Sequence, residues 1–289
     1  MAVVLITGCS SGFGALATEE LSRGGHAVFA TMRDPGGRNH DIATKLAALP
    51  GVRVLELDVT DDLSVERAVD RIVTDGGLDA VVHNAGIGAN GVAEGSTPEQ
   101  FARVFEVNLF GVHRLNRAVL PHLRKQGRGV LIYVSSGLGR TILPYMSAYC
   151  ASKFALEAYA ESLSYEVTVQ GIDTVILQPG AYPTNFRANI LAPDDAVRVK
   201  EYPRETKEAE RMHNNVVEML QSELAPDPRD VTNALLHVLA LPRGERPLRV
   251  ALRKDSGGLK MVNQICGEVQ GALLRGMGFP DRVPKRPQL

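Results

Sequence analysis

The sequence predicts a doubly wound α/β fold, in which a mostly parallel sheet lies between two layers of helices. Short β-branched runs alternate with longer stretches of helical periodicity along most of the chain. Parallel neighbours need a crossover long enough to hold a helix, so this alternation indicates repeated βαβ units. Polar residues also follow the strand ends, in "TG", "NAG", "SS" and "QPG", which is where ligands bind in such sheets.

Seven strands and several helices are expected in chain order. The strands are residues 3–7, 26–32, 52–59, 78–86, 129–136, 172–180 and 247–252. Helical periodicity marks residues 64–74, 98–125, 147–169 and 229–240. This order predicts three layers, α/β/α, in a single Rossmann-like domain over residues 1–289.

Two segments fall outside the repeated units. Residues 181–228 are polar and interrupted by prolines, and we expect them to form a mobile lid over the substrate. A solvated pair of peripheral helices is the alternative for this stretch. Residues 253–289 form a C-terminal extension, whose last part, "PDRVPKRPQL", is expected to be frayed.

Composition excludes several classes of function. The net charge is −1, with 32 basic and 33 acidic residues, so bulk charge indicates neither nucleic acid nor an anionic membrane as partner. The three cysteines and seven histidines have no metal-ligand spacing, and so few cysteines favour a reducing, cytoplasmic compartment. The first apolar run stops at a glycine after five residues without a basic segment before it, so neither a signal peptide nor a membrane span is expected.

A glycine-rich turn follows the first expected strand and opens a helix. In "TGCSSGFG", Gly8, Gly12 and Gly14 lack the β-carbons that would keep a pyrophosphate from the backbone. The turn therefore indicates a dinucleotide site, although its spacing differs from G-x-G-x-x-G and from the Walker loop. A glycine turn that serves only strand-to-helix packing is the alternative.

Tyr149 and Lys153 lie one helical turn apart at the start of the expected helix 147–169. An unperturbed phenol titrates near 10, which is too high for easy proton exchange at neutral pH. A neighbouring ammonium group lowers the pKa of a phenol, so we expect Lys153 to make Tyr149 more acidic. Two ordinary polar residues on a helix surface are the alternative.

These motifs together resemble the short-chain dehydrogenase/reductase family over roughly residues 3–185. The resemblance is carried by "TGCSSGFG", "DV" at 58–59, "HNAG" at 83–86, Asn108, Ser136, "YCASK" at 149–153 and "PGAYPT" at 179–184. The chain has His83 where the family usually has asparagine, so one polar contact at that strand end is in question. The likeness is weakest from residue 186 onward, where the family itself varies with substrate.

The resemblance implies four catalytic residues. Tyr149 would be the general acid/base, and Lys153 would also hydrogen-bond the nicotinamide ribose. Ser136 lies thirteen residues before Tyr149, as the family's catalytic serine does, and is preferred over Ser135; it would donate to the substrate carbonyl. Asn108 would hold a water in a proton relay. A turn hydroxyl for Ser136 and a helix-bending residue for Asn108 are the structural alternatives.

The resemblance also implies the residues that bind the cofactor. They are Gly8, Ser10, Ser11, Gly12, Phe13, Gly14, Arg33, Asp58, Val59, Asn84, Ala85, Gly86, Tyr149, Lys153, Pro179, Gly180 and Thr184. Arg33 and Ser11 resemble the family's arrangement for a 2′-phosphate, and Met32 stands where members that prefer NAD tend to carry an acid. Asp34 could bind a ribose 2′-hydroxyl instead, so NADP is expected and NAD is the alternative.

The sequence therefore predicts an NADP(H)-dependent ketoreductase or alcohol dehydrogenase. A catalytically silent dinucleotide sensor or scaffold, and an epimerase or dehydratase of the extended relatives, are the alternatives. The expected pocket comprises residues 87–95, Leu143, Tyr145 and residues 182–190, which favours a hydrophobic carbonyl or alcohol. Parts of the sequence resemble the steroid and retinol branch and bacterial ketoreductases alike. Family members often pair through the helices expected at 98–125 and 147–169, which would give a homodimer or tetramer. A C-terminal extension that obstructs or replaces such contacts is the alternative, so the sequence leaves the oligomeric state open.

Overall fold

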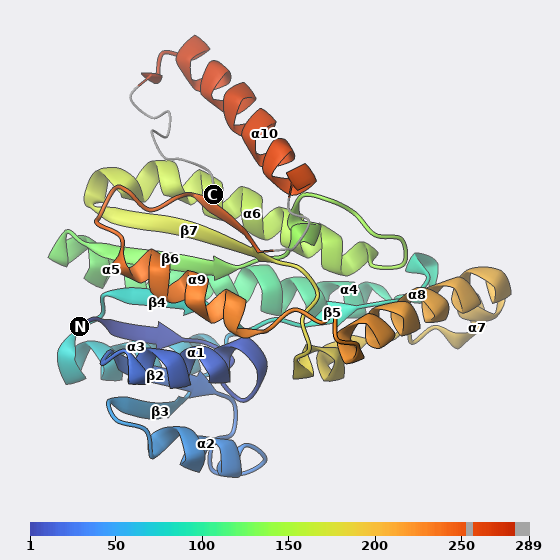
Figure 1. Cartoon of the computed structure of the whole chain (residues 1–289), viewed down its shortest axis with the longest axis horizontal. Helices are drawn as coiled ribbons and strands as arrows, with labels where there is room; N and C mark the ends of the chain where they lie inside the picture. The colour runs from blue at the N-terminus through green and yellow to red at the C-terminus, as the bar shows by residue number, and fades with distance from the viewer. Residues whose placement is uncertain (253–256, 281–289) are drawn as a thin grey trace.

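A seven-stranded parallel sheet forms the centre of the molecule (Figure 1), in a computed structural model that describes residues 1–252 and 257–280. The strand order is β3-β2-β1-β4-β6-β7-β9, and every neighbouring pair is parallel. The strands are β1 (Val3–Ile6), β2 (Ala27–Met32), β3 (Val52–Glu56), β4 (Ala80–His83), β6 (Gly129–Val134), β7 (Ile172–Pro179) and β9 (Arg249–Leu252). The predicted doubly wound α/β fold is confirmed, with strands somewhat shorter than expected.

The strand order reverses direction at β1. The chain runs outward from β1 to β2 and β3, then returns to place β4 on the other side of β1, where Val4 pairs with Ala80. In doubly wound sheets a ligand binds beyond the carboxyl ends of the strands at such a switch point. The glycine turn after β1 and the "HNAG" turn after β4 both end there.

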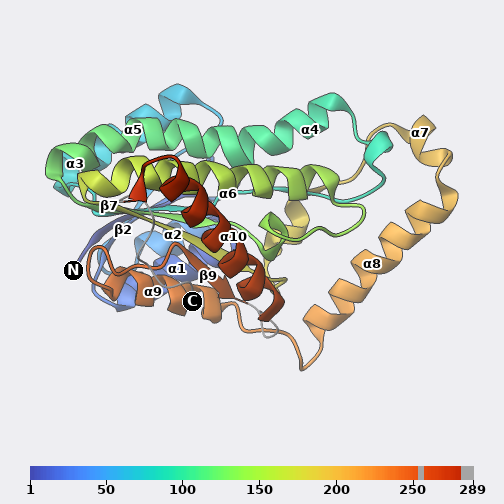
Figure 2. The same cartoon turned by 90° about the horizontal axis from the view of Figure 1, so that it is seen from above.

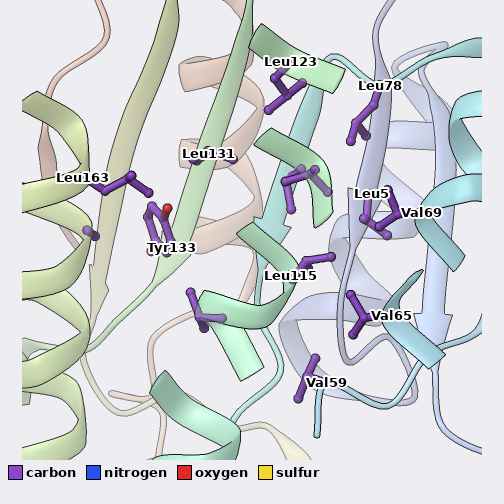
Figure 3. Packing of buried hydrophobic residues seen from close by; sticks show 14 of the residues in the cluster. Leu5, Val59, Val65, Val69, Leu78, Leu115, Leu123, Leu131, Tyr133 and Leu163 are labelled. Atoms are coloured by element: carbon purple, nitrogen blue, oxygen red, sulfur yellow. The ribbon is translucent and has the colours of Figure 1, made fainter. Parts of the chain in front are cut away.

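Helices cover both faces of the sheet, as seen from above in Figure 2. One layer contains α1 (Gly12–Arg23), α2 (His40–Ala47) and α9 (Arg229–Ala240). The other contains α3 (Asp62–Gly76), α5 (Gly111–Gln126) and α6 (Ser147–Val167). Successive strand residues face opposite layers, so Leu5 packs with the second layer while Val4 and Ile6 pack with the first. Figure 3 shows the core on the side of α5 and α6, where Leu115, Leu131 and Leu163 pack together with Tyr133.

The helix expected over residues 98–125 is interrupted. It consists of α4 (Pro98–Phe105), a π-helical turn η2 (Glu106–Phe110) and α5. Thr97 begins α4 with a capping box, in which its side chain accepts from the Gln100 amide and Gln100 reaches back. A π turn inserts one residue into the helical ladder and is frequent at functional sites.

The segment after β7 folds into short elements beside the carboxyl edge of the sheet. A 3-10 turn η5 (Asn185–Asn189) leads to β8 (Ile190–Leu191), which pairs with β5 (Gly88–Ala89) in a separate two-stranded sheet. The helices α7 (Ala196–Lys200) and α8 (Pro203–Gln221) follow and project from the body in Figure 2. Residues 181–228 are therefore largely helical, as the sequence pattern predicts.

The C-terminal extension contains a helix that was not predicted from the sequence. This helix, α10 (Gly257–Gly276), contacts β9 and projects from the body of the molecule in Figure 1. The expected frayed end falls mostly at residues 281–289, outside the described residues. Within residues 1–252 and 257–280, no helix is long and apolar enough to cross a membrane, and no group of three or more potential metal ligands is found.

Candidate active site

The turn between β1 and α1 requires its glycines. Gly8 and Gly12 have φ values of +74° and +58°, a region that L-residues with side chains rarely adopt. A β-carbon at Gly14 would lie 2.5 Å from the Gly8 carbonyl oxygen. The α1 N-terminus has no side-chain cap at Ser11 and no acidic residue in its first turn. Its free amides and positive dipole end therefore suit a phosphate group.

The turn after β4 braces the glycine turn from the side. The Asn84 side-chain Nδ2 donates to the Thr7 backbone carbonyl oxygen at 2.9 Å and to the Gly8 backbone carbonyl oxygen at 3.2 Å. The Thr7 hydroxyl accepts from the backbone amides of Asn84 and Ala85, both at 3.0 Å. The structure thus uses the Asn84 side chain to hold the loop, while Ala85 and Gly86 form the open part of the turn.

Tyr149 and Lys153 are both buried at the start of α6, with 7% and 5% of their surfaces exposed. The Lys153 Nζ donates to the Val134 carbonyl oxygen at 2.9 Å and lies 5.8 Å from the centroid of the Tyr149 ring. Burial lowers the pKa of Lys153 from 10.5 to about 8, and the negative charge of Glu157 acts in the opposite direction. At neutral pH the lysine therefore still carries its charge.

The pKa of Tyr149 differs from the expectation. Burial raises the pKa of Tyr149 to about 12. The neighbouring Ser136 hydroxyl acts in the opposite direction and lowers it, while Cys150 raises it slightly. Desolvation of the phenolate thus outweighs the effect of the Ser136 hydroxyl. The chain's own groups keep Tyr149 protonated, so this side chain is poised to give a proton rather than to take one.

The two adjacent serines after β6 point to different neighbours. The Ser136 hydroxyl lies near enough to the Tyr149 phenol to lower its pKa, and it accepts from the Leu138 amide at 3.1 Å at the start of the short turn η3 (Gly137–Gly139). The Ser135 hydroxyl instead donates to Glu157 at 3.0 Å. Consecutive residues of an extended chain face opposite sides, so only Ser136 joins the tyrosine.

Asn108 lies in the π turn η2 and is almost fully buried. Its Oδ1 accepts from the Ile87 amide at 2.9 Å, and its Nδ2 donates to the Ile87 oxygen and the Ser152 hydroxyl, each at 2.9 Å. Both amide hydrogens are engaged, so Oδ1 alone keeps the capacity for a further hydrogen bond. A β-carbon at Gly86 would lie 3.3 Å from this oxygen and 3.8 Å from the Lys153 Nζ.

Residues at the outer part of the expected cofactor site are more open. Arg33 directly follows β2, is exposed, and has no ion-pair partner among residues 1–252 and 257–280. Asp34 adopts a positive φ of 48° and its carboxylate accepts from the Arg38 amide at 3.0 Å, which ties it to its own turn. The Asp58 carboxylate likewise accepts from the Thr60 amide and hydroxyl, at 2.9 and 2.7 Å.

The segment after β7 connects the glycine turn to the tyrosine. A β-carbon at Gly12 would lie 3.4 Å from the Thr184 Cβ. Two residues later, the Phe186 ring centroid is 5.8 Å from that of Tyr149. The remaining expected contacts have structural partners here. The Phe13 ring packs edge-on against Tyr182, with 5.5 Å between the ring centroids. The Gly180 amide, directly after Pro179, donates to the Leu252 oxygen at 3.1 Å. Ser10 is partly buried in the glycine turn, and Val59 packs against Gly111.

Two residues near the site fall outside the sequence predictions. His83 faces the core, where its ring stacks on Tyr133 at 4.7 Å and burial lowers its pKa to about 3. Glu157 lies fully buried one turn after Lys153. A signal for it was visible, because residues 149, 153, 157 and 161 form one row along the helix and all are ionisable.

Comparison with known proteins identifies the family. Residues 2–195 match the short chain dehydrogenase family. The chain is 40% identical over 188 residues to a 3-ketodihydrosphingosine reductase of Bacteroides thetaiotaomicron. The aligned part is 65% of this chain and 66% of that protein, which is just under two thirds of its length. It is 34% identical over 257 residues to human 17-beta-hydroxysteroid dehydrogenase type 1, covering 83% of this chain and 75% of the relative.

Solved structures agree with this match. An alcohol dehydrogenase from Thermococcus sibiricus, complexed with 5-hydroxy-NADP, is 28% identical with a TM-score of 0.69 and covers 88% of this chain and 97% of its own. A 3-ketoacyl-(acyl-carrier-protein) reductase from Brucella melitensis, complexed with NADH, is 25% identical with a TM-score of 0.68, covering 89% and 97%. The fold and the site define an oxidoreductase of the doubly wound class. The chain belongs to the short-chain dehydrogenase/reductase family.

Proposed function

We propose that this protein is an NADP(H)-dependent oxidoreductase that interconverts a carbonyl compound and an alcohol by hydride transfer. The observation that carries the proposal is the convergence of Ser136, Tyr149 and Lys153 at the carboxyl edge of the sheet, near a turn that only glycines can form. A bound nicotinamide would supply or accept the hydride, and Tyr149 and Lys153 would adjoin it beside Thr184.

The side chains would divide the work of carbonyl reduction. Ser136 would donate a hydrogen bond to the carbonyl oxygen and stabilise the negative charge that develops there. Tyr149, protonated at neutral pH because burial raises its pKa to about 12, would then give its proton to this oxygen. Lys153, whose pKa of about 8 leaves it charged at neutral pH, would stabilise the phenolate that remains.

NADP is the proposed cofactor because of the residues that follow β2. The Arg33 guanidinium is exposed and has no ion pair with the described residues, so it is available for the 2′-phosphate. The Asp34 carboxylate, which would bind a ribose 2′-hydroxyl, is held by the Arg38 amide. The two nucleotide-bound relatives carry an NADP derivative and NADH, so this choice rests on Arg33.

The substrate is proposed to be hydrophobic, with residues 181–228 as a lid. Phe186 lies against Tyr149, and Tyr145 donates from its hydroxyl to Glu208 of α8 at 2.7 Å, which ties the lid to the pocket edge. The apolar residues Ile142 and Leu143 are exposed nearby in sequence. Relatives named for a ketodihydrosphingosine and a hydroxysteroid agree with an apolar substrate.

A silent dinucleotide sensor or scaffold is the second candidate, but no observation favours it. A sensor needs the glycine turn alone, whereas this chain also buries a lysine at a cost in stability, for which catalysis gives a reason.

The test is to incubate the purified protein with NADPH or NADH and a panel of apolar ketones and aldehydes, following nucleotide oxidation. We expect turnover with NADPH, and an increase of about tenfold in its KM for Arg33→Ala without change in the KM for NADH. Arg38→Ala, an exposed arginine of the same loop, is the control. Nucleotide binding without turnover of any carbonyl would favour the sensor, and equal effects of both variants would remove the case for NADP.

A further inference from the structure

We infer that Glu157 is a positioning residue for the catalytic side chains, and that the C-terminal helix α10 supports it through Asn263 and Gln178. This inference rests on the proposed oxidoreductase activity. It concerns a buried cluster that joins five separate segments of the chain, at residues 135–140, 157, 178, 249 and 263.

The Glu157 carboxylate is surrounded by donors. Its Oε1 accepts from the Ser135 hydroxyl at 3.0 Å and from the Gln178 Nε2 at 2.8 Å. Its Oε2 accepts from the Arg249 Nε at 3.0 Å and from the Arg140 Nε at 3.1 Å. The side chain is 2% exposed, so these bonds form away from solvent and fix the geometry of every partner.

Three of the four partners adjoin a segment of the candidate active site, while Arg249 begins β9. Ser135 precedes Ser136, Arg140 directly follows the short turn η3, and Gln178 precedes the Pro179 and Gly180 expected at the cofactor. Glu157 itself lies four residues after Lys153 on the same helical row. One carboxylate therefore sets the relative positions of the serine, the lysine and the end of β7.

The same carboxylate influences the charge of the catalytic lysine. The ionisable groups around Lys153 are Tyr149 and Glu157 on its own helix, and its ammonium group donates to the neutral Val134 oxygen at the end of β6. Glu157 raises the pKa of Lys153 against the effect of burial. Around Glu157 lie Arg140 and Arg249, which also pair with Glu161.

Helix α10 reaches the cluster through one polar side chain. Asn263 is 1% exposed, and its Nδ2 donates to the Gln178 Oε1 at 2.7 Å, while its Oδ1 accepts from the Gln178 Nε2 at 3.4 Å. The Gln178 amide, which also donates to Glu157, is thereby held in one orientation. The extension thus contributes to the cluster through its bonds to the end of β7.

The first experiment compares Glu157→Gln with Glu161→Gln in the pH profile of carbonyl reduction by NADPH. Glutamine keeps the size of the side chain but removes the charge and exchanges one acceptor oxygen for a donor amide, so Lys153 loses its proton at lower pH. We expect the limb on which kcat falls with rising pH to move down by about one pH unit in Glu157→Gln. Glu161→Gln, which pairs with the same arginines one turn further away, should leave it in place. An unmoved limb in Glu157→Gln, or equal shifts in both variants, overturns the inference.

The second experiment tests the link to α10 and needs no turnover. Hydrogen–deuterium exchange of the full chain is compared for Asn263→Leu and Gln264→Leu, since Gln264 is exposed on the same helix. We expect faster exchange at the amides of residues 135–141 in Asn263→Leu alone. In activity, this variant should lose about fivefold in kcat with an unchanged KM for NADPH.

The two failures are distinguishable. If the wild-type protein reduces no carbonyl, the proposed function fails while the exchange experiment still decides whether α10 supports the serine segment. If wild type turns over but both leucine variants exchange alike, the role of α10 is wrong and the proposed activity stands.

Discussion

Two groups of buried ionisable side chains share one face of α6 and differ in how their charges are balanced. In the first, the Lys153 ammonium faces a carbonyl oxygen and the Tyr149 ring, and burial lowers its pKa to about 8. In the second, Glu157 and Glu161 face two arginines, and despite the opposing effect of burial, the charge of Arg249 lowers the pKa of Glu161.

The difference separates the chemistry from its support. A buried charge with opposite charges and donors around it holds segments in place through its hydrogen bonds, as Glu157 does for three segments. A buried charge without such partners is close to giving up its proton, which is the property that a proton-transfer site needs. Successive turns of α6 thus hold first the pair proposed for proton transfer, Tyr149 and Lys153, and then the ion-paired carboxylates of Glu157 and Glu161.

The largest expected effect on stability comes from breaking the balanced group. Arg249→Met leaves the Glu157 carboxylate buried with Arg140 as its remaining cation, and we expect the free energy of unfolding to fall by about 3 kcal/mol. Arg204→Met, which breaks the exposed pair with Glu208, should cost less than about 1 kcal/mol in the same denaturant titration. Similar losses for both variants would contradict the contrast between the two groups.

The adjacent serines sharpen the comparison. Ser136→Ala removes the hydroxyl beside Tyr149, and we expect kcat for carbonyl reduction to fall by about 100-fold with little change in stability. Ser135→Ala removes a donor from Glu157, and should lower the free energy of unfolding by about 1 kcal/mol while kcat changes only a few-fold. The reverse pattern would mean that Ser135 is the catalytic serine.

An effect of the opposite sign, a gain in stability, is expected at the lysine, and it depends on pH. Because burial lowers the Lys153 pKa from 10.5 to about 8, the unfolded state binds the proton more tightly, and this cost is present in full below pH 8. Lys153→Met should therefore raise the free energy of unfolding by about 2 kcal/mol at pH 7, although it abolishes turnover. The gain should shrink as the pH rises from 8 toward 10.5. A stability difference that is independent of pH would show that the ammonium is not desolvated.

The sequence predicts most of the fold because strand and helix periods are local properties. The β-branched runs at β1, β2, β6 and β7 and the row that contains Tyr149 and Lys153 can be read directly. The π turn at Asn108 could not be predicted, because it depends on hydrogen bonds to Ile87, which is distant in sequence. The raised pKa of Tyr149 could not be predicted either, since burial is a property of the folded chain.

The cluster around Glu157 escaped prediction for a related reason. Its partners Arg140, Gln178, Arg249 and Asn263 are spread over more than a hundred residues and meet only after the sheet has formed. Helix α10 has glycines at its start, near its middle and at its end, which weakens the sequence signal for a helix.

The central claim is that Tyr149 transfers the proton in carbonyl reduction, and one measurement tests it most directly. Single-turnover reduction of an apolar ketone by bound NADPH is compared for wild type, Tyr149→Phe and Tyr159→Phe. Tyr159 is the control because it is a partly buried tyrosine of the same helix, whose hydroxyl accepts from Asn116. We predict a loss of about 1000-fold for Tyr149→Phe with unchanged NADPH affinity, and a change within about twofold for Tyr159→Phe. Wild-type rates in Tyr149→Phe would contradict the account.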